Sequence, residues 1–82
     1  MPSVVPPLKS WRVVIYPNDH RPPHVHVIGV QAHARFELLC DIGQVQLMSN
    51  IGFTQSQVQL IAAYLVKHLK HLCNEWGRIH DR

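Results

Sequence analysis

No feature constrains the fold of this chain more than one stretch of eight residues, His20-Arg21-Pro22-Pro23-His24-Val25-His26-Val27. Proline cannot donate to a sheet ladder, so strand pairing is expected to begin only after the two prolines. From His24 to Ile28 polar and apolar residues alternate with the period of a half-buried strand. The two valines then face the core and the two histidines face the opposite way. Residues i and i+2 on a strand lie roughly 6.5–7 Å apart, so both imidazoles can share one ligand.

Three further segments are expected to be strands. Trp11–Tyr16 is rich in aromatic and β-branched residues. His33–Leu38 and Gln44–Met48 alternate in the same way as the histidine strand. A tight connection over Gly29–Ala32, turning on Val30-Gln31, would make an antiparallel meander.

The register across this turn follows from its centre. His26 is expected to lie opposite Arg35, and His24 opposite Glu37. A slip of one residue would exchange the two faces, so the register decides which side chains share the histidine face.

The rest of the chain is predicted to be helical. Thr54 followed by Gln57 forms a capping box, and Phe53 with Val58 a hydrophobic staple. Apolar residues then recur at steps of three and four as one continuous stripe, which comprises Val58, Ile61, Leu65, Leu69, Leu72, Trp76 and Ile79. A straight helix of this length would be roughly 37 Å long, more than a four-stranded sheet needs. The helix is therefore expected either to break near Asn74–Gly77 or to pack its end on a second subunit.

The predicted fold class is α+β, with a four-stranded antiparallel meander covered on one face by one long C-terminal helix. We expect a single domain over residues 1–82, with an extended lead-in at 1–10, a sheet at 11–48 and a helix at 54–79. One helix covers only one face of a sheet. The other face would carry Arg12, Tyr16, His24, His26, His33 and Arg35.

Two kinds of chemistry suit that face. In the first, His24 and His26 act as general acid and base in metal-free RNA cleavage, Arg35 or Arg12 holds the phosphate, and His20 assists. Tyr16, Arg12 and His33 would contact the partner or ligand. The plain alternative is a solvated polar face with no ligand.

In the second, the same histidines bind a metal. His24 and His26 on the strand, with His20 or Asp19 reaching over from the loop, would supply three zinc ligands and leave one coordination position open. The chain would then be a non-enzymatic metal-binding or protein-interaction module, or a metal-dependent catalyst.

Charge and cysteine content indicate the kind of partner and the cellular compartment that we expect. The formal net charge is +3 with seven histidines uncounted, which favours an anionic partner such as RNA, a nucleotide or an acidic protein. Cys40 and Cys73 lack C-x-x-C spacing and are expected to be reduced core residues of a cytoplasmic protein. No signal peptide or membrane span is visible in the sequence.

Several motifs together resemble one known family. They are Met1-Pro2-x-Val4, the strand Trp11–Tyr16, Asn18-x-His20-x-Pro22-Pro23-His24-Val25-His26-Val27, and Gly52-Phe53-Thr54 before a helix that ends near Trp76. In these motifs the chain is similar to the bacterial and archaeal domain-of-unknown-function family number 4160. The resemblance covers nearly the whole chain, and the motif positions are His20, Pro22, Pro23, His24 and His26.

The resemblance implies a small stand-alone protein of no assigned activity, often encoded beside a second small protein in a toxin–antitoxin-like pair. We therefore expect a cytoplasmic module of such a pair that acts through the histidine face. Its partner would be the cognate protein from the adjacent gene, RNA, or a second copy in a homodimer.

Overall fold

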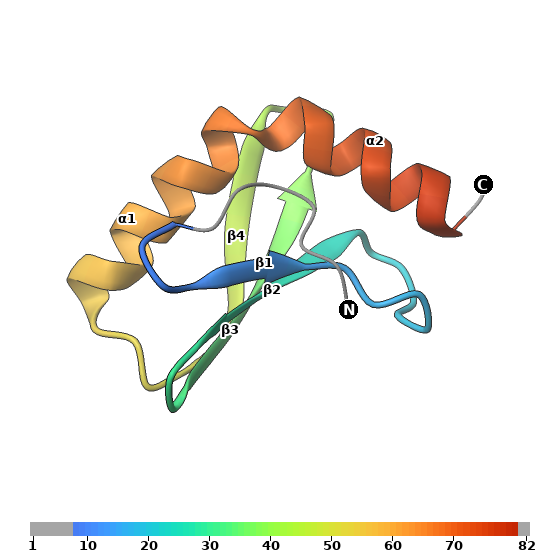
Figure 1. Ribbon diagram of the computed structural model, residues 1–82. Helices are drawn as coiled ribbons and strands as arrows, with labels where there is room; N and C mark the ends of the chain where they lie inside the picture. The colour runs from blue at the N-terminus through green and yellow to red at the C-terminus, as the bar shows by residue number, and fades with distance from the viewer. Residues whose placement is uncertain (1–7, 81–82) are drawn as a thin grey trace.

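The structure is a computed structural model that describes residues 8–80. Its sheet contains β1 (Arg12–Val14), β2 (His24–Gly29), β3 (Ala32–Leu39) and β4 (Gln44–Ile51), in that spatial order and each antiparallel to the next. The helices α1 (Gln55–Lys67) and α2 (Leu69–His80) run across one side of the sheet (Figure 1). The α+β class and the antiparallel meander are confirmed. Most of the expected lead-in at 1–10 lies outside the described residues.

The β2–β3 hairpin has the predicted register. Its turn consists of Val30 and Gln31, and Gln31 adopts a left-handed φ of 57°. His26 therefore pairs with Arg35, and His24 with Glu37. β4 extends to Ile51 and is therefore longer than the predicted strand, which ended at Met48. β3 and β4 stay paired over this length, with one register shift beside Arg35.

The prediction of one long helix is wrong, because two helices meet at His68. The backbone of His68 leaves helical geometry at φ −107° and ψ 16°. Its amide donates to the carbonyls of both Tyr64 and Leu65, as at a helix end. The expected break at Asn74–Gly77 is also wrong, since these residues lie inside α2. The bend at His68 lets the apolar stripe follow the twisted sheet.

The helix start is as predicted. Thr54 Oγ1 accepts from the Gln57 amide at 3.1 Å, and Gln57 Oε1 accepts from the Thr54 amide at 2.8 Å. This reciprocal capping satisfies two amides that the first turn of a helix otherwise leaves without partners.

The core lies between the sheet and the helices. The strands and the segment around them contribute Val13, Ile15, Val25, Val27, Ala34, Phe36 and Leu38, and the helical side contributes Phe53, Ile61, Leu65, Leu69, Leu72 and Trp76. The predicted stripe thus faces the sheet, as its period indicates. The histidines of β2 consequently point to the side of the sheet away from the helices.

The two cysteines form a disulfide, so the expectation of two reduced core residues is wrong. Cys40 follows β3 and Cys73 lies in α2, and their Cα atoms are 6.2 Å apart. Cys40 is exposed and is not part of the core. Their separation of 33 residues along the chain gives no sign of this contact, which depends on where the bent helix crosses the sheet. Within residues 8–80, neither helix combines the length and apolar character that a membrane crossing requires.

Candidate metal centre

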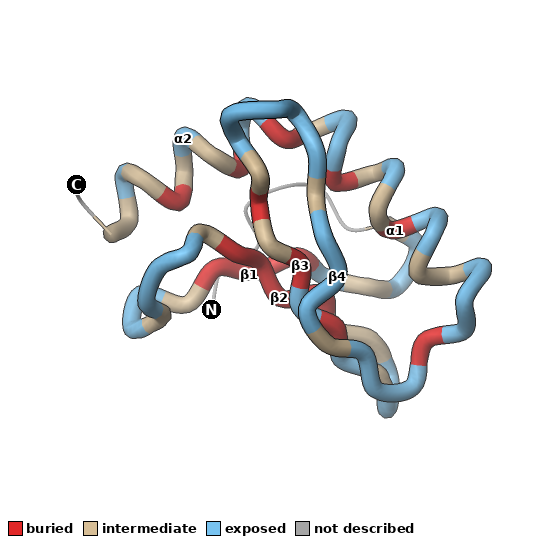
Figure 2. Tube along the Cα trace, turned by 180° about the vertical axis from the view of Figure 1, so that it is seen from behind, coloured by how far each residue is buried: buried red, intermediate tan, exposed pale blue. Residues whose placement is uncertain are grey.

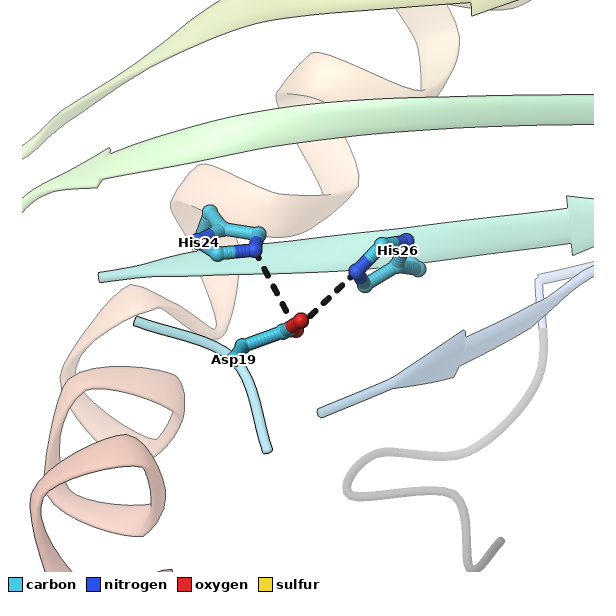
Figure 3. Close-up of side chains that lie close together, drawn as sticks. All are labelled: Asp19, His24 and His26. Carbon is cyan, nitrogen blue, oxygen red and sulfur yellow. Dashed lines mark hydrogen bonds and ion pairs between the residues drawn. The ribbon is translucent and has the colours of Figure 1, made fainter. Parts of the chain in front are cut away.

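The loop between β1 and β2 brings a carboxylate onto the two histidines of β2. Asp19 Oδ2 lies 3.1 Å from His24 Nε2 and 3.0 Å from His26 Nε2 (Figure 3). One carboxylate oxygen thus faces both imidazoles. Within residues 8–80 these three side chains form the group suited to holding a metal ion, with all three ligand atoms within 4.8 Å of one another.

The loop itself is held by backbone contacts at both ends. The Asp19 amide donates to the Tyr16 carbonyl at 3.1 Å, which closes a turn just before the carboxylate. The same carbonyl lies 3.2 Å from Nε2 of His80, in the last turn of α2. At the other end, the Pro23 carbonyl accepts from the Leu38 amide at 2.8 Å. Asp19 is therefore carried by a segment fastened to both β3 and α2.

The far nitrogen of each histidine also has a partner. His24 Nδ1 lies 2.8 Å from the Pro22 carbonyl oxygen, and His26 Nδ1 lies 2.9 Å from His33 Nε2. A carbonyl oxygen only accepts, so the hydrogen of His24 must be on Nδ1. On a neutral ring, His24 Nε2 then presents a lone pair to the Asp19 carboxylate. Two acceptors face each other unless a proton or a cation lies between them.

The histidines are more buried than the sequence predicted. His24 and His26 are only 6% and 8% exposed, and Val14 beside them is 1% exposed. The loop that carries Asp19 covers this part of the sheet, and the Tyr16 ring packs edge-on against His26 at a centroid distance of 4.6 Å. The sequence predicted that the face away from the helix would be open or buried in a partner, whereas the chain's own loop covers these two residues.

Burial has an electrostatic consequence at His26. Desolvation is the largest influence and lowers the pKa of His26 below 6.5, and the neighbouring His33 and His24 lower it further. The hydrogen bond and the charge of Asp19 act in the opposite direction without reversing the shift. The imidazole of His26 is thus kept in the neutral form, which is the form that coordinates metals.

The remaining predicted site residues lie around this group. His20, which both hypotheses from the sequence include, is exposed and is not a member of the cluster. Of the two residues named as a possible third ligand, His20 and Asp19, the cluster contains Asp19. His33 is exposed but reaches His26. Arg35 is exposed and pairs with His26, so it shares the face of the cluster, but its Nε donates to Ser49 Oγ on the opposite neighbour, β4. Arg12 is exposed on β1.

The donor set suits a divalent transition metal. Zinc is bound by imidazole nitrogen and carboxylate oxygen at ~2.0–2.2 Å, which separates neighbouring ligands of a tetrahedral ion by roughly 3.3–3.6 Å. The two distances to Asp19 Oδ2 are 3.0 and 3.1 Å, so a small widening would admit an ion. The Pro22 carbonyl on His24 Nδ1 is a partner of the kind that usually orients metal-bound histidines, and His33 Nε2 occupies the corresponding position on His26 Nδ1.

Comparison with known proteins gives a family and no activity. Neither the search of curated proteins nor that of solved structures returned a match. A family model described as a domain of unknown function, DUF4160, matches residues 10–77 and therefore includes the whole cluster. The resemblance noted in the sequence is thereby confirmed, and the chain belongs to the DUF4160 family.

Proposed function

We propose that this protein binds a divalent transition metal, with zinc the best fit, through Asp19 Oδ2, His24 Nε2 and His26 Nε2. The observation that carries the proposal is the orientation of His24. Its Nδ1 hydrogen is committed to the Pro22 carbonyl, while its Nε2 faces a carboxylate oxygen at 3.1 Å. A cation between them converts two opposed acceptors into two ligands.

The surrounding contacts support the same arrangement. When His26 Nε2 is a ligand, its Nδ1 hydrogen donates to His33 Nε2, and the distance of 2.9 Å between these two nitrogens suits that bond. Each ligand histidine then has an outer partner that fixes its ring and its tautomer.

The number of ligands favours a reactive ion over a structural one. Structural zinc sites are closed by four protein ligands, whereas catalytic sites use three and leave one position for water. An ion held by these three residues would lower the pKa of a bound water to about 7 and so supply hydroxide as a nucleophile. We therefore propose a hydrolytic reaction, in which Asp19, His24 and His26 hold the ion and His33 orients His26.

A second candidate uses the same residues without a metal. Asp19 Oδ2, His26 and His33 form a continuous chain of contacts at 3.0 and 2.9 Å, and His33 ends it at the exposed surface. A carboxylate that orients one imidazole, which in turn contacts an exposed one, is suited to general acid–base catalysis. Together with a net charge of +3, this supports action on the phosphodiester bonds of RNA. A toxin–antitoxin-like pairing with a cognate small protein remains a proposal based on family resemblance.

Calorimetric titration with zinc separates the two candidates. The protein should be prepared without a histidine tag, and we expect one zinc per chain. Asp19→Asn preserves the size of the side chain and removes its charge, so it should weaken zinc binding at least ~10-fold. His20→Gln, on the exposed loop residue next to it, is the matched control and should bind zinc like the wild type.

The outcomes have distinct meanings. Zinc binding that is equal in Asp19→Asn and the wild type would contradict the proposed site. No zinc binding, together with RNA cleavage that resists a chelator and is lost in His33→Gln, would establish the second candidate in its place. Co-expression with the product of the adjacent gene tests the proposed protein partner separately.

A further inference from the structure

One long part of the chain carries no charge. From Gln44 to Val66 there is no Asp, Glu, Lys, Arg or His, so all eight Lys and Arg, five Asp and Glu and seven His lie elsewhere. This stretch forms β4 and nearly all of α1. An uncharged segment of this length on the surface of a basic protein differs from an ordinary solvated face, which mixes charges of both signs.

The same two elements expose most of the large apolar side chains. Seven large hydrophobic residues of the described chain are exposed, and five of these come from β4 and α1. They are Leu47 at 41%, Met48 at 39%, Ile51 at 73%, Leu60 at 43% and Val66 at 41%. Figure 2 shows the run of exposed residues along β4. Leu47 pairs with the core residue Phe36 and so lies on the helix side of the sheet, whereas Ile51 pairs with His33 and lies on the other side. These five residues therefore flank the β4 edge on both faces, and we refer to them as the β4–α1 patch.

β4 is also an open edge of the sheet. It is the last strand in the order β1-β2-β3-β4, so along one side its backbone groups have no strand partner among residues 8–80. Edge strands are usually protected by being short or by carrying charges or proline. β4 has eight residues, Gln-Val-Gln-Leu-Met-Ser-Asn-Ile, none of which is charged or proline. Its one protective feature is the irregularity where it pairs with β3 beside Arg35.

We propose that the β4–α1 patch binds a second copy of this chain, with the two β4 strands paired antiparallel about a two-fold axis perpendicular to the sheet. Such pairing is isologous, because each strand meets the same strand of its partner. The amide and hydroxyl side chains of β4 both donate and accept, so they are complementary to themselves. The patch has no charged side chain that could pair with a charged partner. Cores of protein–protein interfaces are themselves depleted in charged residues, so the patch suits an equally uncharged surface, such as its own copy.

The symmetry also accounts for the helix. α1 follows directly on β4, and a two-fold axis perpendicular to the sheet keeps the helices of both copies on one side. Because α1 packs against β4, the two α1 helices then lie on the same side of the joined sheet near the paired edge, and each carries exposed Leu60 and Val66. The Asp19 cluster lies on the other side of the sheet, over β2, so the proposed dimer leaves it accessible. This inference is independent of the proposed metal site.

Light scattering after size-exclusion chromatography tests the proposal. The wild type should have twice the chain mass of 9.4 kDa. Leu47→Lys and Ile51→Lys each place like charges near the paired edge and should shift the protein to monomer, with at least ~10-fold weaker association. Ile42→Lys is the matched control, because Ile42 is equally apolar and 68% exposed but lies in the β3–β4 turn, and it should remain dimeric. Circular dichroism verifies that each variant is folded, and Ile51, at 73% exposure, keeps the test valid should Leu47→Lys fail to fold.

A charge-swap experiment tests the symmetry. Leu47 lies near the middle of β4, so Leu47→Lys and Leu47→Glu should each be monomeric alone and should form a heterodimer when mixed. A wild type that is monomeric at all concentrations would overturn the proposal. A dimer that is unaffected by the β4 substitutions, or folded Lys and Glu variants that do not associate when mixed, would overturn it equally.

Discussion

Reduction of the Cys40–Cys73 disulfide should destabilise the protein strongly. The cross-link joins residues separated by 33 positions and so restricts the unfolded chain more than the folded one. The chain-entropy relation gives a contribution of about 3.7 kcal/mol at 25 °C for a loop of this length. A chain of 82 residues is expected to have a total stability of about 4–12 kcal/mol. The disulfide would therefore supply roughly a third or more of it.

Urea denaturation with and without a reductant measures this effect. Small domains have m-values of about 1–1.5 kcal/mol per molar urea, so a loss of about 3.7 kcal/mol lowers the midpoint by about 2.5–3.7 M. The m-value should rise slightly after reduction, because the unfolded chain becomes less compact. The double variant Cys40→Ala/Cys73→Ala is the control and should unfold near the midpoint of the reduced wild type, with or without reductant.

Two results would refute this reasoning. Two free thiols, detected by alkylation of the protein unfolded without reductant, would show that the bond does not form in solution. Equal urea midpoints for the oxidised and reduced wild type would show that the cross-link adds no stability. A persistent disulfide would also argue against the cytoplasmic location expected from the sequence, because that compartment keeps most thiols reduced.

Four further predictions rest on burial and backbone geometry. The pKa of His26 is lowered below 6.5 in the folded protein, so below this pH the unfolded state binds more protons. The free energy of unfolding should therefore fall as the pH drops through about 6.5. Urea titrations at several pH values should show a weaker pH dependence for His26→Gln. Leu72→Ala, at a fully buried position, should lower the free energy of unfolding by about 2–5 kcal/mol. Ile42→Ala, at a position of the β3–β4 turn that is 68% exposed, should lower it by less than about 1 kcal/mol in the same measurement. Gly52→Ala should lower the melting temperature, because φ is 94° and a Cβ would lie 2.4 Å from a backbone oxygen of the β2–β3 turn. Gly77 lies inside α2, and a Cβ added there would have nothing within 4 Å. Gly77→Ala should therefore raise the melting temperature, by an amount equivalent to about 0.5–1 kcal/mol of stability.

Any function proposed for this protein has to be consistent with the cluster of Asp19, His24 and His26. The three ligand atoms come from two adjacent elements, the β1–β2 loop and β2, so the group does not depend on the distant helices for its ligands. The helices act on it indirectly, because His80 of α2 contacts the Tyr16 carbonyl that also holds the Asp19 turn. Truncation of α2 should therefore affect both stability and ligand binding.

Local chemistry was sufficient to predict much of this fold from the sequence. The alternation in His24–Ile28 determines which side chains share a face, and the two-residue turn at Val30 and Gln31 determines that His26 lies opposite Arg35. The capping box at Thr54 determines where the helix begins. Each of these features depends on residues a few positions apart, whose geometry is the same in most surroundings.

Only the tertiary structure decided the features that depend on distant residues. The burial of His24 and His26 depends on how the β1–β2 loop folds over the sheet, and the choice of Asp19 over His20 depends on the direction of that loop. The helix bends at His68 because its apolar stripe must follow a twisted sheet, and that bend brings Cys73 to Cys40. Periodicity along the chain carries no information on these contacts, since they are set by the packing of one element on another.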